Sequence, residues 1–164
     1  MKQAKFIHRL TRVMESHKQR LFLYACYRLG SVAEAEDVLQ DVYLRLLERQ
    51  TEVEKVENLS AYIFRTLVNT CSSRAVSPRF VELSSQELSD IGSEPESFEE
   101  EAERITLLLA LLPEEMREVI RLKIYGGLTF EEVGSTLGLS ASTAKRRYYE
   151  GLELLRNKYN LLLI

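Results

Sequence analysis

A stretch of 23 residues without a single basic side chain divides this sequence in two. Residues 81–103 carry nine acids and no Lys or Arg, which gives them a net charge of −9. The flanking segments are basic, at +4 for residues 1–80 and +2 for residues 104–164, so the overall charge of −3 conceals the division. A charged stretch rich in Ser, Gly and Pro cannot bury enough apolar area to offset the entropy of ordering it. It predicts a flexible acidic linker between two small domains, with a solvated surface loop of a single domain as the alternative.

Apolar residues on both sides of this stretch recur at the spacing of amphipathic helices. A first stripe runs from Phe6 to Ala25 and is expected to end at Gly30. Ser31 followed by Glu34 has the spacing of a capping box, which predicts a second helix with its stripe from Val38 to Leu47. Asn58 or Ser60 is expected to cap a third helix. No stretch alternates like a strand, so the predicted fold is all-α, with domains at 1–80 and 102–164 and a linker at 81–101.

The C-terminal segment has the pattern of a helix-turn-helix. Pro113 with Glu114 is expected to open one helix, since Pro fits the first helical position. Thr129 to Glu132 forms a capping box that starts a short helix ending near Gly138. Ser140 is expected to cap a final, longer and basic helix. The motif also needs small residues, and Gly134, Gly138 and Ala144 are expected to provide the close approach, the turn and the packing contact.

The second helix of such a motif enters the major groove, so its exposed N-terminal residues are expected to touch DNA. Hydroxyl groups bind phosphates and some base edges, while Lys and Arg add charge and guanine contacts. A solvated basic helix face is the alternative for the three bases taken alone. The predicted DNA contacts are Ser140, Ser142, Thr143, Lys145, Arg146 and Arg147.

Three segments resemble the extracytoplasmic-function group of bacterial sigma factors. Residues 111–120, 128–134 and 139–145 are similar to its fourth domain, which carries the helix-turn-helix. Residues 35–46, AEDVLQDVYLRL, are similar to the second domain's AEDLVQEVFLRLW, and residues 58–65, NLSAYIFR, resemble NPRAWLYR. The resemblance covers nearly the whole chain in the right order. It implies a subunit that binds core RNA polymerase and directs transcription from particular promoters.

The resemblance also implies particular contacts for each part of the chain. In the family, the helix matching residues 37–45 docks on the clamp helices of the polymerase's largest subunit, and the fourth domain meets the flap of the second-largest subunit. This gives the polymerase-binding set Asp37, Gln40, Asp41, Leu44 and Arg45. The segment from 58 to 79 matches the part that melts and reads the minus-ten promoter element. Its expected DNA contacts are Asn58, Tyr62, Phe64, Arg65, Asn69 and Arg74, and the fourth domain would bind the minus-thirty-five element.

Two departures from the family pattern predict weak DNA binding by the free chain. Relatives carry a run of arginines near the end of the minus-ten helix, where this chain has Val68 and then residues 70–73, TCSS. In the last helix, residues 150–152, EGL, replace the usual RAR. Each missing phosphate contact removes a counterion-release contribution to affinity. The sequence therefore predicts loose reading of the minus-ten element, with recognition confined to the holoenzyme.

Three function classes follow from these patterns. The first is the sigma factor, with an anti-sigma factor as a further partner that the sequence does not identify. The second is a polymerase-binding adaptor brought to promoters by a separate DNA-targeting partner. The third is a stand-alone helix-turn-helix regulator, but no heptad repeat supplies a dimerisation helix.

Enzymatic, metal and membrane roles find no support in the sequence. His8 and His17 lie on a surface-type helix, no nucleophile–base constellation or phosphate-binding glycine loop is present, and neither a cofactor nor a metal ligand set is expected. The longest apolar run is 107–112, which is far shorter than the ~20 residues of a membrane span. Two cysteines without a CxxC pattern fit a reducing cytoplasm.

Overall fold

The computed structural model describes residues 1–74 and 97–162. Within these ranges the chain forms helices and turns and contains no strand. The N-terminal half comprises α1 (Lys2–Ser16), α2 (Lys18–Leu29), α3 (Val32–Glu48), α4 (Gln50–Val53) and α5 (Leu59–Arg74). The C-terminal half comprises α7 (Phe98–Leu109), α8 (Glu114–Ile124), α9 (Phe130–Leu137) and α10 (Ala141–Leu162). The predicted all-α fold is confirmed.

Side-chain caps set most of the helix boundaries that the sequence predicts. Ser31 accepts a hydrogen bond from the Glu34 amide at 3.2 Å and begins α3. Asn58, rather than Ser60, caps α5, because its Oδ1 accepts from the Ala61 amide at 3.1 Å. Thr129 forms both bonds of its capping box, and Ser140 Oγ accepts from the Thr143 amide at 3.1 Å.

Two boundaries differ from the sequence prediction. The first expected helix is interrupted at His17, which separates α1 from α2 although the apolar periodicity continues through it. Pro113 is the N-cap of α8, one position before the first helical residue. Of the expected linker 81–101, residues 81–96 lie outside the described residues, and Phe98 to Glu101 already form the first turn of α7.

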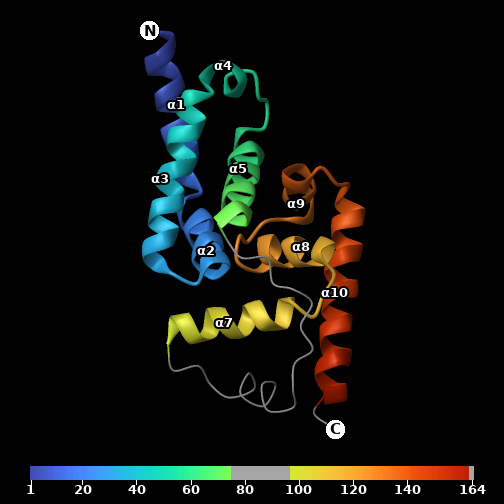
Figure 1. The fold of residues 1–164 in the computed structure, drawn as a ribbon. Helices are drawn as coiled ribbons and strands as arrows, with labels where there is room; N and C mark the ends of the chain where they lie inside the picture. Colours follow the sequence, from blue (N-terminus) through green and yellow to red (C-terminus); the bar gives the residue numbers. More distant parts are fainter. Residues whose placement is uncertain (75–96, 163–164) are drawn as a thin grey trace.

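The two halves pack against each other. Figure 1 shows α7 and α8 lying across the lower end of the bundle formed by α2, α3 and α5, with α9 beside α5 and α10 along the outer edge. The main hydrophobic cluster contains residues of both halves, from Phe6 and Tyr24 to Val119, Leu128 and Val133. A second, smaller cluster lies between α8 and α10 and includes Leu112 and Ile120. In the described residues the interior is therefore continuous across the two halves.

Candidate nucleic-acid interface

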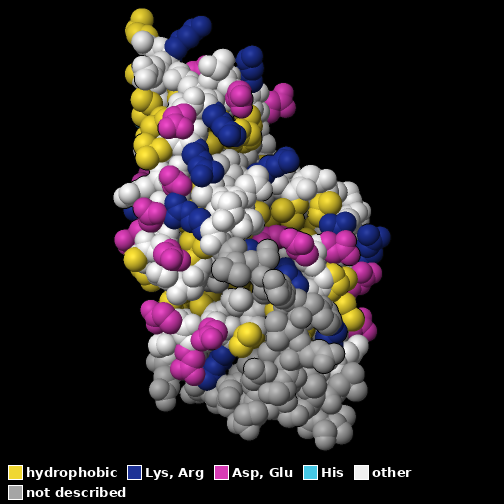
Figure 2. Space-filling view, in the orientation of Figure 1, with side chains coloured by type: hydrophobic (Ala, Val, Ile, Leu, Met, Phe, Trp, Pro, Cys, Tyr) yellow, Lys and Arg dark blue, Asp and Glu magenta, His cyan; other side chains and the backbone are white. Residues whose placement is uncertain are grey.

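A basic pocket opens between the C-terminal end of α3 and the middle of α5. Its volume is about 360 Å³. Three arginines, one tyrosine and an asparagine contribute to its wall, together with two threonines and a leucine: Arg45, Arg49, Arg65, Tyr62, Asn69, Thr66, Thr70 and Leu46. In Figure 2 dark-blue Lys and Arg side chains lie along the front of the upper half, over the region where α3 and α5 meet. A cavity with cations, an aromatic ring and an amide can hold an unstacked base and its phosphates.

The structure brings three of the predicted minus-ten residues together in this pocket, namely Tyr62, Arg65 and Asn69. The other three lie elsewhere. Asn58 is exposed at the start of α5, where its side chain caps the helix. Phe64 is only 2% exposed and its ring meets His17 edge-to-face, so it belongs to the core and faces no ligand. Arg74, at the last turn of α5, binds acids of α3 instead.

Two pocket arginines come from the C-terminal end of α3, where sequence reasoning placed none of the DNA contacts: Arg45 lies in the last turn and Arg49 is the C-cap. Arg49 was missed altogether, and Arg45 was assigned to polymerase binding. The two lie four residues apart, so they share one face of α3 and its C-terminal end. No local pattern marks Arg49 as a pocket residue, because its place beside α5 depends on the packing of two distant segments.

The recognition segment of α10 is open to solvent at its start. Ser140, Ser142, Lys145 and Arg146 are exposed, whereas Thr143 and Arg147 are partly buried. The Ser140 hydroxyl lies 2.8 Å from Thr143 Oγ1 and 3.3 Å from Ser142 Oγ, so these hydroxyls form one local cluster. All six predicted residues thus share the first two turns and the N-cap of α10. This is the part of the second helix that meets base edges in a helix-turn-helix.

Tyr149 is a further exposed group on α10 that the sequence analysis did not single out. It is 54% exposed and stands seven residues after Ser142, on the same side of the helix. Its ring lies 5.2 Å from that of Tyr148 and 6.0 Å from that of Phe130. Lys123 Nζ stands 4.6 Å from the centre of the Phe130 ring. An aromatic cluster with an adjacent cation therefore flanks the basic start of α10.

Known protein families match both the half that contains the pocket and the half that contains the helix-turn-helix. Residues 13–77 match the family described as Sigma-70 region 2, and residues 108–157 match Sigma-70, region 4. The chain belongs to the extracytoplasmic-function sigma factors. Proteins of this family are RNA polymerase subunits for promoter-specific initiation, and the chain is such a sigma factor.

Individual relatives resemble most of this sigma factor. The RNA polymerase sigma-E factor of Streptomyces avermitilis is 28% identical over 127 residues, which cover 76% of this chain and 70% of the relative. The factor SigW of Bacillus subtilis is 26% identical, covering 89% of this chain and 86% of its own. The sigma factor RpoE of Bartonella quintana, solved in complex with the anti-sigma factor NepR, has the same fold, with a TM-score of 0.56 and 21% identity over 97% of this chain and 96% of RpoE.

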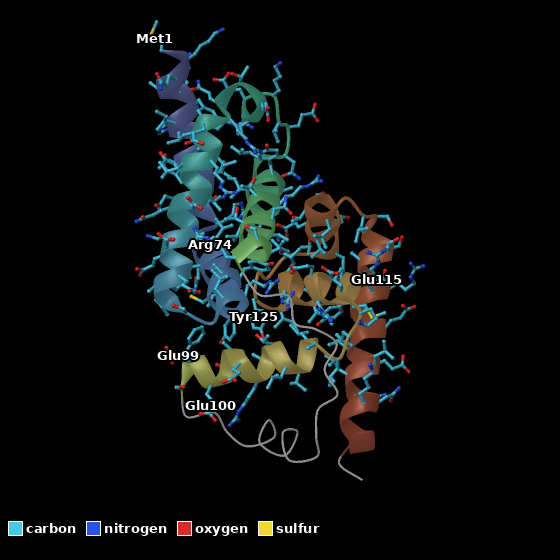
Figure 3. All side chains as sticks on the ribbon, viewed as in Figure 1. Met1, Arg74, Glu99, Glu100, Glu115 and Tyr125 are labelled. Carbon is cyan, nitrogen blue, oxygen red and sulfur yellow. The ribbon has the colours of Figure 1, made fainter. Side chains whose placement is uncertain are left out.

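The residues predicted to bind polymerase lie on the outer face of α3. Asp37 is 70% exposed, and Gln40, Leu44 and Arg45 are exposed as well. Asp41 is partly covered, because Arg74 Nη2 donates to its Oδ2 at 2.8 Å while Arg74 Nη1 donates to Asp37 at 2.7 Å. These bonds hold the pKa of Arg74 above its ordinary value, mainly through the hydrogen bonds with the two carboxylates. Figure 3 shows Arg74 at the lower end of α5, where that helix meets α3.

In residues 1–74 and 97–162 no three His, Cys, Asp or Glu side chains gather in a way that could hold a metal ion. Within the same ranges, none of the helices combines the length and the apolar character needed to span a membrane.

Proposed function

We propose that this sigma factor reads promoter DNA at two separate sites. The pocket between α3 and α5 would hold an unstacked base of the minus-ten non-template strand, and the first turns of α10 would bind the minus-thirty-five duplex. The pocket carries the first half of the proposal, because it combines Arg45, Arg49 and Arg65 with the Tyr62 ring and the Asn69 amide. Arginine offers charge to the phosphates, tyrosine a stacking surface, and the amide hydrogen bonds to a base edge.

The pocket also supports minus-ten recognition despite the missing arginine run of α5. Arg45 and Arg49 supply cations from α3 at the place where α5 offers only Arg65. The first domain would comprise residues 1–80, and the second, predicted from the sequence to span 102–164, would include the whole of α7 from Phe98. The α3 face would dock on the clamp of core polymerase and the second domain on the flap. A sigma factor of this kind needs no catalytic residue or cofactor of its own, and it would work in the bacterial cytoplasm.

In vitro transcription with core polymerase and this protein alone tests the proposal. We expect promoter-specific transcripts from the parent chain and from Arg12→Ala, which removes an exposed arginine outside the pocket. Asn69→Ala should flatten the dependence on one minus-ten position, and Arg49→Ala should weaken all templates evenly. No promoter-specific transcript from the parent would refute the two-site proposal and favour the adaptor that depends on a targeting partner.

An anti-sigma factor is a second proposed partner. The fold likeness to RpoE, a protein solved with the anti-sigma factor NepR, supports it. Such a partner would compete with polymerase or DNA for the surfaces described above. Co-purification of the full chain from its native host, with and without induction, would test whether a non-polymerase protein binds it.

A further inference from the structure

The junction between the two halves is built from aromatic stacking and apolar packing. α2 packs against α7 and α8, and α5 packs against α9. The Tyr27 ring of α2 stacks on Tyr125 at 4.1 Å with the planes 13° apart, and meets Phe98 edge-to-face at 5.2 Å. Tyr27 Oη also donates to Glu101 at 3.2 Å. Figure 3 shows Tyr125 between α2, α7 and α8. Every one of these partners of Tyr27 belongs to the C-terminal half.

A nearly buried acid, Glu118 of α8, lies at the centre of this junction. Tyr24 Oη of α2 donates to Glu118 Oε2 at 2.6 Å. Arg28 Nε of α2 stands 3.6 Å from Glu118 Oε1, and Arg121 Nη1 donates to the same oxygen at 2.8 Å. The side chains of Glu118, Arg28 and Arg121 are only 18%, 8% and 6% exposed. A buried carboxylate is costly unless it is paired, so these contacts fix how the halves fit together.

The same residues allow the junction to separate. Glu118 and Arg121 both belong to α8 and stand three residues apart, so their ion pair survives when α2 leaves. Arg28 loses its ion pair with Glu118 on opening, but its Nε, which is buried without a hydrogen-bond partner, would regain water and offset part of that loss. A charged centre of this kind is a feature of transient contacts between domains, and it lies beside the hydrophobic cluster that continues across the junction.

One departure from the family pattern lies next to the junction. Cys71 of α5 is fully buried, and the charges of Arg28, Glu118 and Arg121 all act on its thiol. An arginine in this buried place would need its own acid partner. Of the small side chains that replace the arginine run of α5, Cys71 is thus the one that lies next to the C-terminal half.

The closed arrangement cannot reach both promoter elements. The centres of the minus-ten and minus-thirty-five elements are about 25 base pairs apart, or about 85 Å along B-DNA at ~3.4 Å per pair. A compact chain of this length has a radius of gyration of only about 15 Å. In Figure 1, α5 and the start of α10 are separated by little more than α9. The two halves must therefore part before the promoter can be bound at both sites.

We propose that the contact of α2 and α5 with α7, α8 and α9, centred on Glu118, is an autoinhibitory closed state that competes with promoter binding in the holoenzyme. The proposal rests on the two-site function proposed above. Molecules in the closed state cannot bind both promoter elements, so this state lowers the fraction of sigma molecules that are competent to bind the promoter. If it holds nine-tenths of the free molecules, it raises the apparent dissociation constant about tenfold.

Charge reversal at the centre of the junction tests the closed state directly. Glu118→Lys places a third cation beside Arg28 and Arg121, and should raise the radius of gyration measured by small-angle X-ray scattering. Glu115→Lys makes the same charge change on the same helix, at an exposed position beside α10 (Figure 3), and should leave it unchanged. Tyr27→Ala provides a second opening variant, because Tyr27 is only partly buried and its loss spares the α1–α5 core.

Transcription with core polymerase gives the functional outcome. The opening variants should reach half-maximal transcription at up to about tenfold lower concentration than the parent and Glu115→Lys. If Glu118→Lys and Tyr27→Ala keep the parent's radius of gyration and helical circular dichroism, the junction does not hold the halves together and the proposal fails. If the two opening variants have a larger radius of gyration but reach half-maximal transcription at the same concentration as the parent, the contact does not compete with promoter binding and the proposal also fails. If neither parent nor Glu115→Lys supports transcription, the sigma function itself fails, whatever the scattering shows.

Discussion

Arg74 joins the last turn of α5 to the middle of α3 by donating to Asp41 at 2.8 Å and to Asp37 at 2.7 Å. These ion pairs join residues of two predicted sites, since Arg74 was predicted to bind minus-ten DNA and the two acids to bind polymerase. A guanidinium that holds both carboxylates cannot bind a phosphate with the same donors. A minus-ten contact of Arg74 would therefore be coupled to a polymerase contact of Asp41.

This coupling predicts opposite effects of two substitutions on polymerase binding. Asp41→Arg places a third cation beside Arg74 and Arg45, and should weaken the complex with core polymerase by about tenfold, or ~1.4 kcal/mol. Arg74→Ala frees Asp37 and leaves Asp41 with only the longer 3.7 Å contact to Arg45, and it should leave core binding equal or tighter. Because this ion pair is partly exposed, its loss should cost the fold only about 0.5–1 kcal/mol.

Titration of core polymerase with labelled protein measures both effects, with helicity by circular dichroism as the control for folding. Equal affinity of Asp41→Arg and the parent would show that the outer face of α3 is not the docking surface. Weaker binding of Arg74→Ala would show that the guanidinium itself contacts polymerase.

Burial of Cys71 makes stability depend on pH in the alkaline range. Burial raises the pKa of the Cys71 thiol to about 12. The unfolded chain loses this proton near the ordinary pKa of about 8.5, whereas the folded chain keeps it. The stabilising effect is therefore complete below pH 8.5 and is lost progressively as the pH rises toward 12, at up to about 1.4 kcal/mol per pH unit.

Urea unfolding at pH 7.5, 8.5 and 9.5 checks this dependence. The free energy of unfolding of the parent should fall more steeply with pH than that of Cys71→Ala, although the variant is less stable at neutral pH. Cys26→Ala provides the matched control, because burial raises the pKa of that thiol less. Identical slopes for the parent and Cys71→Ala would contradict the expected burial.

The sequence predicted the helices well because their boundaries depend on local chemistry. Ser31, Asn58, Thr129 and Ser140 each cap the helix that follows, through bonds that span three residues. Local signals failed at His17, where the apolar stripe continues unbroken although the helix does not. Periodicity records which face is buried, and it does not record a change of helix direction.

Contacts between distant segments could not be predicted in the same way. Tyr24 and Glu118 are 94 residues apart, and nothing local in either segment indicates their hydrogen bond. Phe64 was expected at the DNA because aromatic rings bind single strands, but burial against His17 takes precedence. Arg49 is the opposite case, a residue that was not predicted to bind DNA but lines the pocket. Only the packing of α3 on α5 places this ordinary surface arginine there.

Gly134 allows the two helices of the helix-turn-helix to approach, as the sequence predicted. A Cβ atom at this position would overlap the Leu139 carbonyl oxygen and lie 3.3 Å from the Ser140 carbonyl carbon. Both obstacles are backbone atoms that cannot rotate away. Gly134→Ala should therefore lower the free energy of unfolding by about 1–3 kcal/mol.

Ser135→Ala provides the control for Gly134→Ala, because the neighbouring Ser135 is exposed and alanine favours a helix. Guanidinium unfolding of both variants measures the difference. If Gly134→Ala is as stable as Ser135→Ala, then α9 and α10 are farther apart than the structure places them.

The basic start of α10 should account for most of the minus-thirty-five affinity. Lys145 and Arg146 are exposed and Arg147 is partly buried, so all three can reach a duplex laid along the first two turns. Replacing all three by alanine should reduce binding of the holoenzyme to a promoter duplex and lower the slope of log affinity against log salt by up to about 3, because each phosphate contact releases roughly one counterion. Arg156→Ala is the matched control, since that exposed arginine lies farther along the same helix.

Among single variants, the residue that contacts a base edge should lose ~1–3 kcal/mol at one promoter position, whereas a phosphate contact should lose affinity evenly across sequences. Binding by the triple variant that equals Arg156→Ala in both affinity and salt slope would remove α10 from the DNA interface.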